Sequence, residues 1–255
     1  MIIEEEVWKG IPLIHFYDEK MNEHSPVVIF FHGFQSAKEH NLHYAYQLVR
    51  KGIRVLLPDA YLHGERDEQL NEEQMNLKFW NIVIQSIHEL EYIYEQLTAR
   101  FAPKKIGIAG TSMGGITSFG CLKRYDWISA AAICMGAPGY NEFLNYQLNS
   151  IEKTGGKLPL TIEQKEQVHN TLAEYDITGA PERLNQRPII FWHGNQDRTV
   201  PMENAYHFYT KIRPYYKQSP EKIQFIVAEN QGHKVNREGV LMVTDFLVKH
   251  LTNDD

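Results

Sequence analysis

Ile106-Gly107-Ile108-Ala109-Gly110-Thr111-Ser112-Met113-Gly114-Gly115 is an apolar run that ends in the pattern G-x-S-x-G. A helix-compatible stretch, residues 116–124, follows it at once. This order predicts a nucleophile elbow, a strand-to-helix turn that holds a serine in a strained backbone conformation at the edge of a sheet. Gly110 and Gly114 suit so sharp a turn, because a side chain at either position would collide with the neighbouring strand or helix. A flexible Gly/Ser loop could carry the same letters, so the interpretation depends on the rest of the chain.

A nucleophilic serine needs a base and an orienting acid, and after such an elbow they follow in the chain order Ser, Asp or Glu, His. The apolar run 188–192 ends in a short polar loop that holds Asp197, and the strand-like run 223–228 precedes a loop that holds His233. Each of the three residues therefore follows a different predicted strand at its C-terminal end. In an open α/β sheet this is the edge at which sites assemble. We predict that Ser112, Asp197 and His233 are catalytic.

An acyl-transfer site also needs two backbone N–H groups that point at the developing oxyanion. Residues 27–31 form an apolar strand that ends in His32-Gly33-Phe34-Gln35. One donor comes from the residue after the nucleophile and the other from the loop after an early strand, which gives Met113 and Phe34. Taken alone, His-Gly-Phe would be an ordinary turn that leaves a strand.

These motifs together resemble a known family. H-G-F at 32–34, G-T-S-M-G-G at 110–115, H-G-x-x-D-x-x-V-P at 193–201 and G-H at 232–233 resemble the α/β-hydrolase superfamily, in its branch similar to dienelactone hydrolase and prolyl oligopeptidase. The chain is most similar to single-domain bacterial proteins usually labelled esterases, from the first predicted strand to the last helix. The resemblance implies an α/β-hydrolase fold and a serine hydrolase of the carboxylesterase type. The sequence has no N-terminal propeller, so a gated oligopeptidase is not expected, and serine stands where dienelactone hydrolase uses cysteine.

Predicted strands and helices alternate as a mostly parallel, doubly wound sheet requires. Residues 2–17 suggest an antiparallel hairpin at one edge of that sheet. The remaining predicted elements are strands at 54–57 and 130–135 and helices at 40–51, 72–101 and 238–250.

The segment between Gly136 and Pro188 is too long for an ordinary connection. Residues 141–151 have helical apolar spacing, 154–156 break it, and Thr161 to Gln164 form a capping box that opens a second helix toward residue 175. We predict a helical cap, residues 137–187, inserted into a hydrolase core of residues 1–136 and 188–255. A peripheral hairpin that never contacts substrate is the alternative. The candidate substrate-contacting residues are Tyr140, Phe143, Leu144, Leu148 and His63.

Other residues compete for the catalytic roles. His32 and His193 each stand beside a glycine at a strand end and are expected to be packing residues. His63 follows a strand at the same edge, but it precedes the serine in the chain. Asp59 and Glu142 are the alternatives for the orienting acid.

Composition excludes several classes of function. The net charge of −6 without a basic cluster argues against nucleic acid and anionic membranes as partners. The N-terminus has no signal-peptide pattern, and the two cysteines, Cys121 and Cys134, read as reduced core residues, so a cytoplasmic protein is expected. His40 and His43 have a spacing that can ligate a metal but are accompanied only by Glu39, so neither metal nor cofactor is expected.

The sequence is thus interpreted as a monomeric or homodimeric serine hydrolase that cleaves small carboxylic esters through an acyl-enzyme. Ser112 attacks the carbonyl, His233 moves the proton, and Asp197 orients the imidazole. Two alternatives stay open: a small peptidase or amidase of the same branch, and a catalytically silent hydrolase fold that serves as a binding module.

Overall fold

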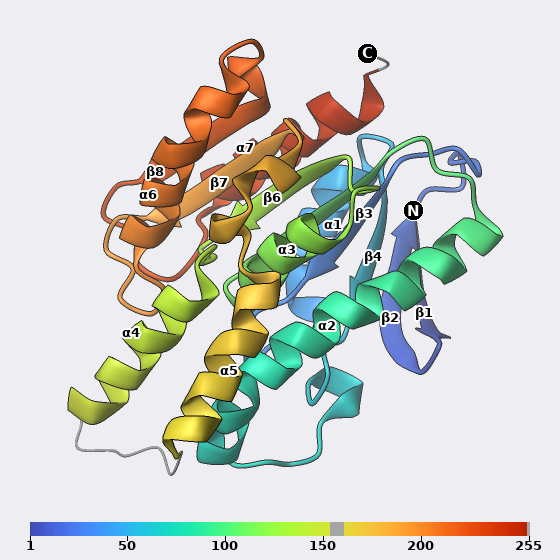
Figure 1. The fold of residues 1–255 in the computed structure, drawn as a ribbon. Coiled ribbons are helices and arrows are strands. Elements are labelled where there is room, and N and C mark those ends of the chain that lie inside the picture. The colour runs from blue at the N-terminus through green and yellow to red at the C-terminus, as the bar shows by residue number, and fades with distance from the viewer. Residues whose placement is uncertain (154–160, 254–255) are drawn as a thin grey trace.

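An eight-stranded sheet in the order β1-β2-β4-β3-β5-β6-β7-β8 organises the chain, which this computed structural model describes over residues 1–153 and 161–253 (Figure 1). The hairpin β1–β2 and the pair β2–β4 are antiparallel, and all other neighbours are parallel. The mostly parallel sheet with an N-terminal antiparallel edge is therefore confirmed. The strands are β1 (Ile2–Trp8), β2 (Ile11–Tyr17), β3 (Val27–Phe31), β4 (Arg54–Pro58), β5 (Ile106–Thr111), β6 (Ala130–Cys134), β7 (Ile189–Gly194) and β8 (Ile223–Ala228).

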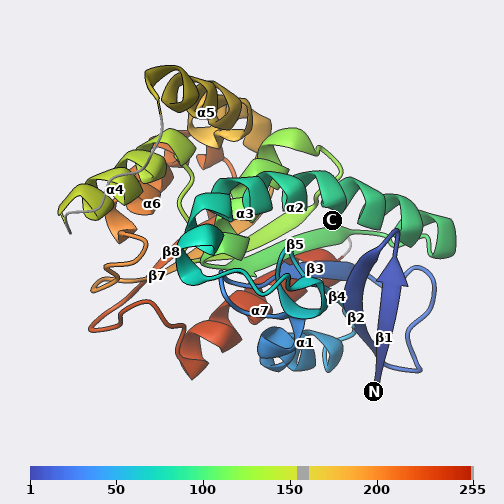
Figure 2. The same cartoon turned by 90° about the horizontal axis from the view of Figure 1, so that it is seen from below.

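Helices cover both faces of the sheet, as Figure 2 shows from below. The helices α1 (Leu42–Val49) and α7 (Arg237–Thr252) lie against each other on one face, and α2 (Glu72–Arg100) and α3 (Met113–Arg124) lie against each other on the other. Every residue of β3, β4, β6 and β7 is buried, because these strands are covered on both sides. This double burial explains why they read as continuous apolar runs in the sequence.

The helix α6 (Met202–Ile212) was not predicted from the sequence. It buries Ala205, Phe208 and Ile212 at helical spacing, and its other residues are partly or fully exposed. The apolar residues return at a helical spacing, so a signal for α6 was present in the sequence. None of the described helices, in residues 1–153 and 161–253, is long and apolar enough to cross a membrane.

Two helices, α4 (Tyr140–Lys153) and α5 (Ile162–Tyr175), form the predicted insertion between β6 and β7 and lie side by side (Figures 1 and 2). The predicted capping box is present: the Thr161 side chain accepts the Gln164 N–H, and the Gln164 side chain accepts the Thr161 N–H. The Asp176 carboxylate, just after α5, accepts the Tyr140 N–H at the start of α4 at 2.8 Å. The helix break expected at residues 154–156 lies outside the described residues.

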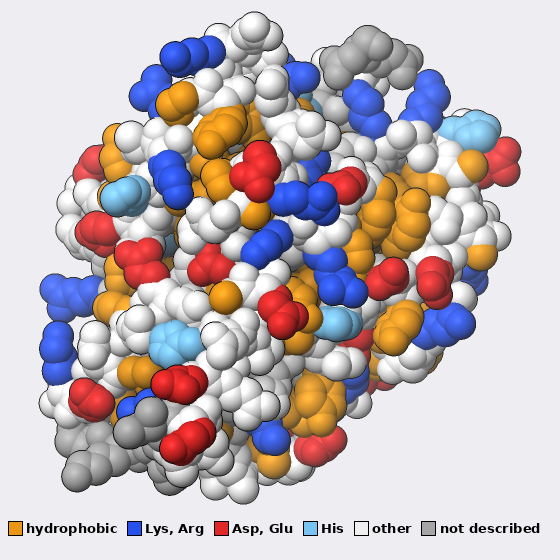
Figure 3. Space-filling view, in the orientation of Figure 1, with side chains coloured by type: hydrophobic (Ala, Val, Ile, Leu, Met, Phe, Trp, Pro, Cys, Tyr) orange, Lys and Arg blue, Asp and Glu red, His pale blue; other side chains and the backbone are white. Residues whose placement is uncertain are grey.

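Acidic and basic side chains are interspersed on the face of the molecule shown in Figure 3.

Cys121 in α3 and Cys134 in β6 are buried free thiols, and burial raises the pKa of Cys134 to about 12. Both cysteines thus behave as small core residues, as the sequence predicts.

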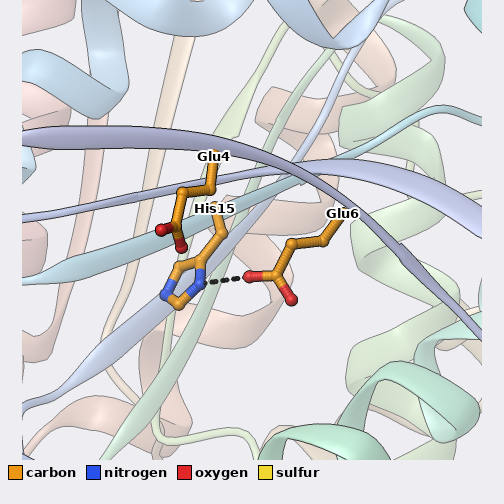
Figure 4. A group of neighbouring side chains, drawn as sticks. All are labelled: Glu4, Glu6 and His15. Carbon is orange, nitrogen blue, oxygen red and sulfur yellow. Dashed lines mark hydrogen bonds and ion pairs between the residues drawn. The ribbon is translucent and has the colours of Figure 1, made fainter.

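At the antiparallel edge, Glu4, Glu6 and His15 converge in an arrangement that resembles a ligand set (Figure 4). His15 Nδ1 lies 2.7 Å from Glu6 Oε1, and His15 Nε2 lies 2.7 Å from an Arg54 nitrogen. A guanidinium only donates, so Nε2 accepts and Nδ1 carries the proton. Arg100 donates a further hydrogen bond to Glu6. Both ring nitrogens are therefore in use, and two arginines already balance the carboxylates, so the group ties the hairpin to the sheet and is not suited to a metal.

The turn between β5 and α3 is sterically extreme. Ser112 has φ +55° and ψ −117°, a conformation that side chains rarely adopt. A Cβ at Gly110 would lie 2.3 Å from the Gly114 carbonyl, and a Cβ at Gly114 would lie 2.2 Å from the Phe31 carbonyl oxygen. The start of α3 therefore touches the backbone of two strands, which only glycine permits.

This contact predicts the cost of a single methyl group. Gly114→Ala should lower the free energy of unfolding by about 3 kcal/mol, because the methyl group meets backbone that cannot move aside. Urea denaturation measures the change. Gly179→Ala is the matched control, since no atom lies within 4 Å of a Cβ at that position. Equal denaturation midpoints for the two variants would contradict this account of the turn.

Candidate active site

Ser112, Asp197 and His233 lie together at the C-terminal edge of the sheet, in the turns that follow β5, β7 and β8. His233 Nε2 is 2.7 Å from Ser112 Oγ, and His233 Nδ1 is 2.6 Å from Asp197 Oδ2. A carboxylate only accepts, so it selects the tautomer that carries the proton on Nδ1. Nε2 then faces the serine as an acceptor. The arrangement can take a proton from the hydroxyl.

The Asp197 carboxylate is buried and saturated with donors. Its Oδ1 accepts the Thr199 and Val200 N–H groups at 2.9 and 3.0 Å, and His193 Nε2 lies 3.4 Å from its Oδ2. Burial alone would raise the pKa of Asp197, but the hydrogen bonds from His193 and His233 outweigh burial and hold it well below its usual range. The carboxylate therefore stays ionised at any pH at which the protein would work.

His193 does more than the packing expected of it. It is buried, and its Nε2–H points at the Val200 carbonyl at 2.8 Å while it faces the Asp197 carboxylate. The ring thus holds the loop that carries Asp197 through its contacts with the Val200 carbonyl and the Asp197 carboxylate. The spacing H-G-x-x-D held the signal for this contact, since both residues flank one tight turn at a strand end.

The backbone of the loop after β3 runs beside the serine. A Cβ at Gly33 would lie 3.6 Å from Ser112 Cβ. His32 Nδ1–H donates to the Gly33 carbonyl at 2.8 Å. Because a trans peptide points its C=O and N–H in opposite directions, this bond turns the Phe34 N–H away from His32. Met113 is the first residue of α3, where backbone N–H groups have no partner within the helix.

The two other histidines at this edge are held in neutral form. His32 Nε2 accepts the Ala60 N–H at 3.0 Å, and burial lowers the pKa of His32 to about 4. His63 Nε2 accepts the Gln35 N–H at 3.0 Å, and its Nδ1–H donates to the Tyr61 carbonyl at 2.9 Å. Both nitrogens of His63 are therefore engaged with backbone. The contact of His63 with substrate stays a prediction, and it would not use the ring nitrogens.

The alternative acids have other partners. Asp59 is fully buried and accepts hydrogen bonds from the Lys38 ammonium at 2.9 Å, the Lys38 N–H at 3.0 Å and the Glu65 N–H at 3.1 Å. Glu142 is exposed in the first turn of α4. Arg66 makes a two-pronged bond to Glu89 of α2, with both distances 2.7 Å. Asp59 thus joins two loops and does not orient His233.

The candidate substrate-contacting residues of α4 lie in an aromatic cluster that reaches the loop after β3. Phe34 contacts Phe79 edge to face at 5.4 Å between ring centroids, and Phe79 contacts Phe143 at 6.2 Å. Leu144 is buried beside them and Leu148 is half-buried. Tyr146 donates its hydroxyl proton to the Arg198 carbonyl at 2.6 Å, next to Asp197. The helix α4 therefore contacts the loop after β7 directly and the loop after β3 through Phe79 of α2.

Tyr140 is placed differently from the expectation. Its side chain is fully buried, and its hydroxyl donates to the Ile116 carbonyl at 2.6 Å and accepts the Gly120 N–H at 3.0 Å. Both bonds go to α3. Tyr140 thus anchors the start of α4 to the core and has no polar group left for a substrate.

The chain is similar to known proteins over nearly its whole length. The sequence profile of the prolyl oligopeptidase family matches residues 40–254. The chain is 42% identical to the Bacillus subtilis protein named "Putative esterase YitV" over 253 residues, which cover 98% of this chain and 99% of that protein. Esterase YjfP of Escherichia coli is 29% identical over 209 residues, covering 80% of this chain and 81% of that protein. TT1662 from Thermus thermophilus superposes with a TM-score of 0.79 at 20% identity, covering 99% of both chains. The predicted α/β-hydrolase fold is confirmed.

The buried bond between Lys38 and Asp59 leads to a prediction about stability. Asp59→Asn should lower the free energy of unfolding by about 3 kcal/mol, because it leaves a buried ammonium with only the outer carboxylates of Glu39 and Glu65. Chemical denaturation near pH 7 is the measurement. Asp126→Asn, which removes a carboxylate from an exposed ion pair with Arg183, should leave the midpoint unchanged. An unchanged midpoint for Asp59→Asn would show that the buried pair does not hold the two loops together.

Proposed function

The chain belongs to the prolyl oligopeptidase family, and from this we propose that it is a serine hydrolase that cleaves carboxylic esters of small molecules through an acyl-enzyme. The names of its relatives support ester cleavage. The observation that carries the proposal is the unbroken hydrogen-bond chain from Asp197 through His233 to Ser112. A catalytically silent binding module would have no use for this chain or for the strained turn that presents the serine.

In the proposed mechanism, Ser112 Oγ attacks the ester carbonyl while His233 Nε2 takes the hydroxyl proton. The imidazolium that forms lies against the ionised Asp197, which stabilises the charge and takes no proton itself. The Phe34 and Met113 N–H groups hold the oxyanion. Collapse of the tetrahedral intermediate breaks the C–O bond, and His233 Nε2–H protonates the leaving alcohol. A water molecule then attacks the acyl-enzyme by the same steps in reverse, and every role is filled by the chain's own groups.

We also propose that residues 137–187 act as a cap over the acyl group, and that the core comprises residues 1–136 and 188–255. The support is the position of α4, which is joined to the loop after β7 by Tyr146 and to the loop after β3 through Phe79 and Phe143. Phe34 and Leu148, which are half-buried, would contact the acyl chain, with Phe143 and Leu144 behind them. A cap of this kind excludes water from the oxyanion and strengthens its hydrogen bonds.

The buried free thiols Cys121 and Cys134 support a reducing compartment, so we propose a cytoplasmic enzyme.

The site of Ser112, Asp197 and His233 can also cleave amides if the leaving nitrogen is protonated before the tetrahedral intermediate collapses. Parallel assays of p-nitrophenyl acetate and p-nitroacetanilide separate the two activities, and we expect turnover of the ester to be the faster by far.

Two substitutions test the catalytic chain. Ser112→Ala should lower kcat for p-nitrophenyl acetate by at least about a thousandfold, because no nucleophile remains. Asp197→Asn should lower it by about ten-thousandfold, because the amide favours the wrong imidazole tautomer. Glu142→Gln, which removes an exposed carboxylate of the cap, is the matched control and should retain wild-type turnover. A clean Ser112→Ala preparation with wild-type activity would exclude this residue as the nucleophile.

A substitution in α4 tests the cap. Leu148→Ala should shift the preferred acyl length and cost about 1–3 kcal/mol of transition-state binding for the best substrate, while acetyl esters stay active. The series of p-nitrophenyl esters from acetate to decanoate gives the profile. Leu77→Ala removes an exposed leucine of α2 and should leave the profile unchanged. Identical profiles for both variants would favour a peripheral hairpin over a cap.

A further inference from the structure

His63 is a buried histidine that the proposed mechanism does not use. Its Nε2 lies 3.0 Å from the Gln35 nitrogen, and its Nδ1 lies 2.9 Å from the Tyr61 carbonyl oxygen. A backbone N–H only donates and a carbonyl only accepts, so these partners select one form of the ring. His63 is neutral, with its proton on Nδ1 and its free electron pair on Nε2.

The bond to Gln35 holds one of the two peptide groups that flank Phe34. The peptide before Phe34 is held through its carbonyl by His32. The peptide after Phe34 is held through its N–H by His63. Since each peptide group is planar, fixing both planes sets the φ and ψ angles of Phe34 between them. The direction of the Phe34 N–H therefore depends on both imidazoles.

The backbone at Gln35 needs such a partner. Gln35 has φ +55°, in the left-handed region that costs energy for residues other than glycine. Rotation of the peptide between Phe34 and Gln35 would relieve this strain and move its N–H away. The acceptor on His63 opposes that rotation. The His63 ring also contacts the Phe34 ring, with 5.5 Å between centroids, so it holds the same residue by its side chain.

Protonation of His63 would place a proton on Nε2, which would then face the Gln35 N–H. The hydrogen bond between them would be lost. The groups that face His63 are the His32 ring at 5.2 Å between centroids, the carboxylates of Asp59 and Asp67, and the Tyr61 carbonyl. Burial lowers the pKa of His63 and outweighs the opposing effects of the Tyr61 carbonyl and the two carboxylates. The acceptor is thus present at neutral pH.

Building on the proposed function, we infer that His63 is a positioning residue of the oxyanion hole. It holds the peptide between Phe34 and Gln35 and so keeps the Phe34 N–H aimed at the ester oxygen. In this role His63 acts only through the backbone of the loop after β3 and needs no contact with the substrate or with Ser112.

Paired variants separate this role from simple packing. His63→Leu fills the space without an acceptor, and His63→Gln keeps an amide oxygen near the position of Nε2. We expect His63→Leu to lower kcat for p-nitrophenyl acetate by about 10- to 100-fold with KM nearly unchanged, which is less than the loss of a whole oxyanion donor. His63→Gln should recover most of that loss. His24→Leu is the control, because His24 also bonds a backbone carbonyl, that of Ala102, but in an exposed loop outside the site.

A transition-state analogue gives a second readout. An alkyl trifluoromethyl ketone adds the serine oxygen to its carbonyl, with the hydroxyl proton passing to His233, and leaves a negatively charged oxygen in the oxyanion hole. The inhibition constant of this ketone should rise in His63→Leu by the same factor by which kcat/KM falls. If kcat and this constant both stay within about twofold of wild type, or if His63→Gln is as impaired as His63→Leu, the inference is wrong.

Nitrogen-15 NMR of the wild-type ring tests the geometry without any turnover, and applies even if His63→Leu does not fold. The ring of His63 should be neutral, with its proton on Nδ1, at pH 7. A proton on Nε2, or a charged ring, would overturn the inference. Absence of ester turnover and of a ketone adduct in the wild-type protein would instead refute the proposed function, while the ring measurement would still report on the bond to Gln35.

Discussion

The close approach of α3 to the backbone of β3 and β5 is the constraint on which the rest of the structure depends. Because Gly110 and Gly114 have no Cβ, the start of α3 can approach the backbone of β5 and the Phe31 carbonyl of β3 more closely than any other residue would allow. The contact forces Ser112 into its unusual conformation, in which its hydroxyl meets the His233 ring. It also brings the start of α3 next to the loop after β3. One steric condition thereby places the serine and the two proposed backbone donors, Phe34 and Met113, at the same edge of the sheet.

The roles of the two buried aspartates at this edge of the sheet follow from the hydrogen-bond donors that each carboxylate has. Asp197 is kept ionised by donors from two histidines and two backbone N–H groups. Asp59 follows β4, which β3, β5 and β6 separate from β7 in the sheet, and it is neutralised by the buried ammonium of Lys38. Two buried aspartates thus share one edge but have different uses, one to orient an imidazole and one to join loops. Their hydrogen-bond partners, and not how deeply they are buried, distinguish the two aspartates.

The fold was largely predictable, since strands buried on both faces leave continuous apolar runs such as Val27–Phe31, and glycines at 110 and 114 mark the turn. The order of Ser112, Asp197 and His233 after successive strands likewise suggested that they would lie at one edge. The partners of single polar groups were not predictable. Tyr140 bonds backbone in α3 and His63 bonds the Gln35 N–H, in both cases far away in the chain, which no local pattern reveals. The helix α6 was missed although the helical spacing of Ala205, Phe208 and Ile212 is visible in the sequence.

The hairpin at the N-terminus leaves β1 at the margin of the sheet, with Ile3 and Val7 exposed beside Glu4, Glu5 and Glu6. A bare strand of this kind offers unpaired backbone groups to any other chain, and glutamates there repel a second copy. Hydrogen bonds from Trp8, Arg100 and His15 outweigh the effect of burial and lower the pKa of Glu6 to about 2, so its charge persists far into acid. The hydrogen bonds that tie β1 to the rest of the molecule are therefore kept at a pH at which ordinary carboxylates have lost their charge, so the edge strand stays attached there.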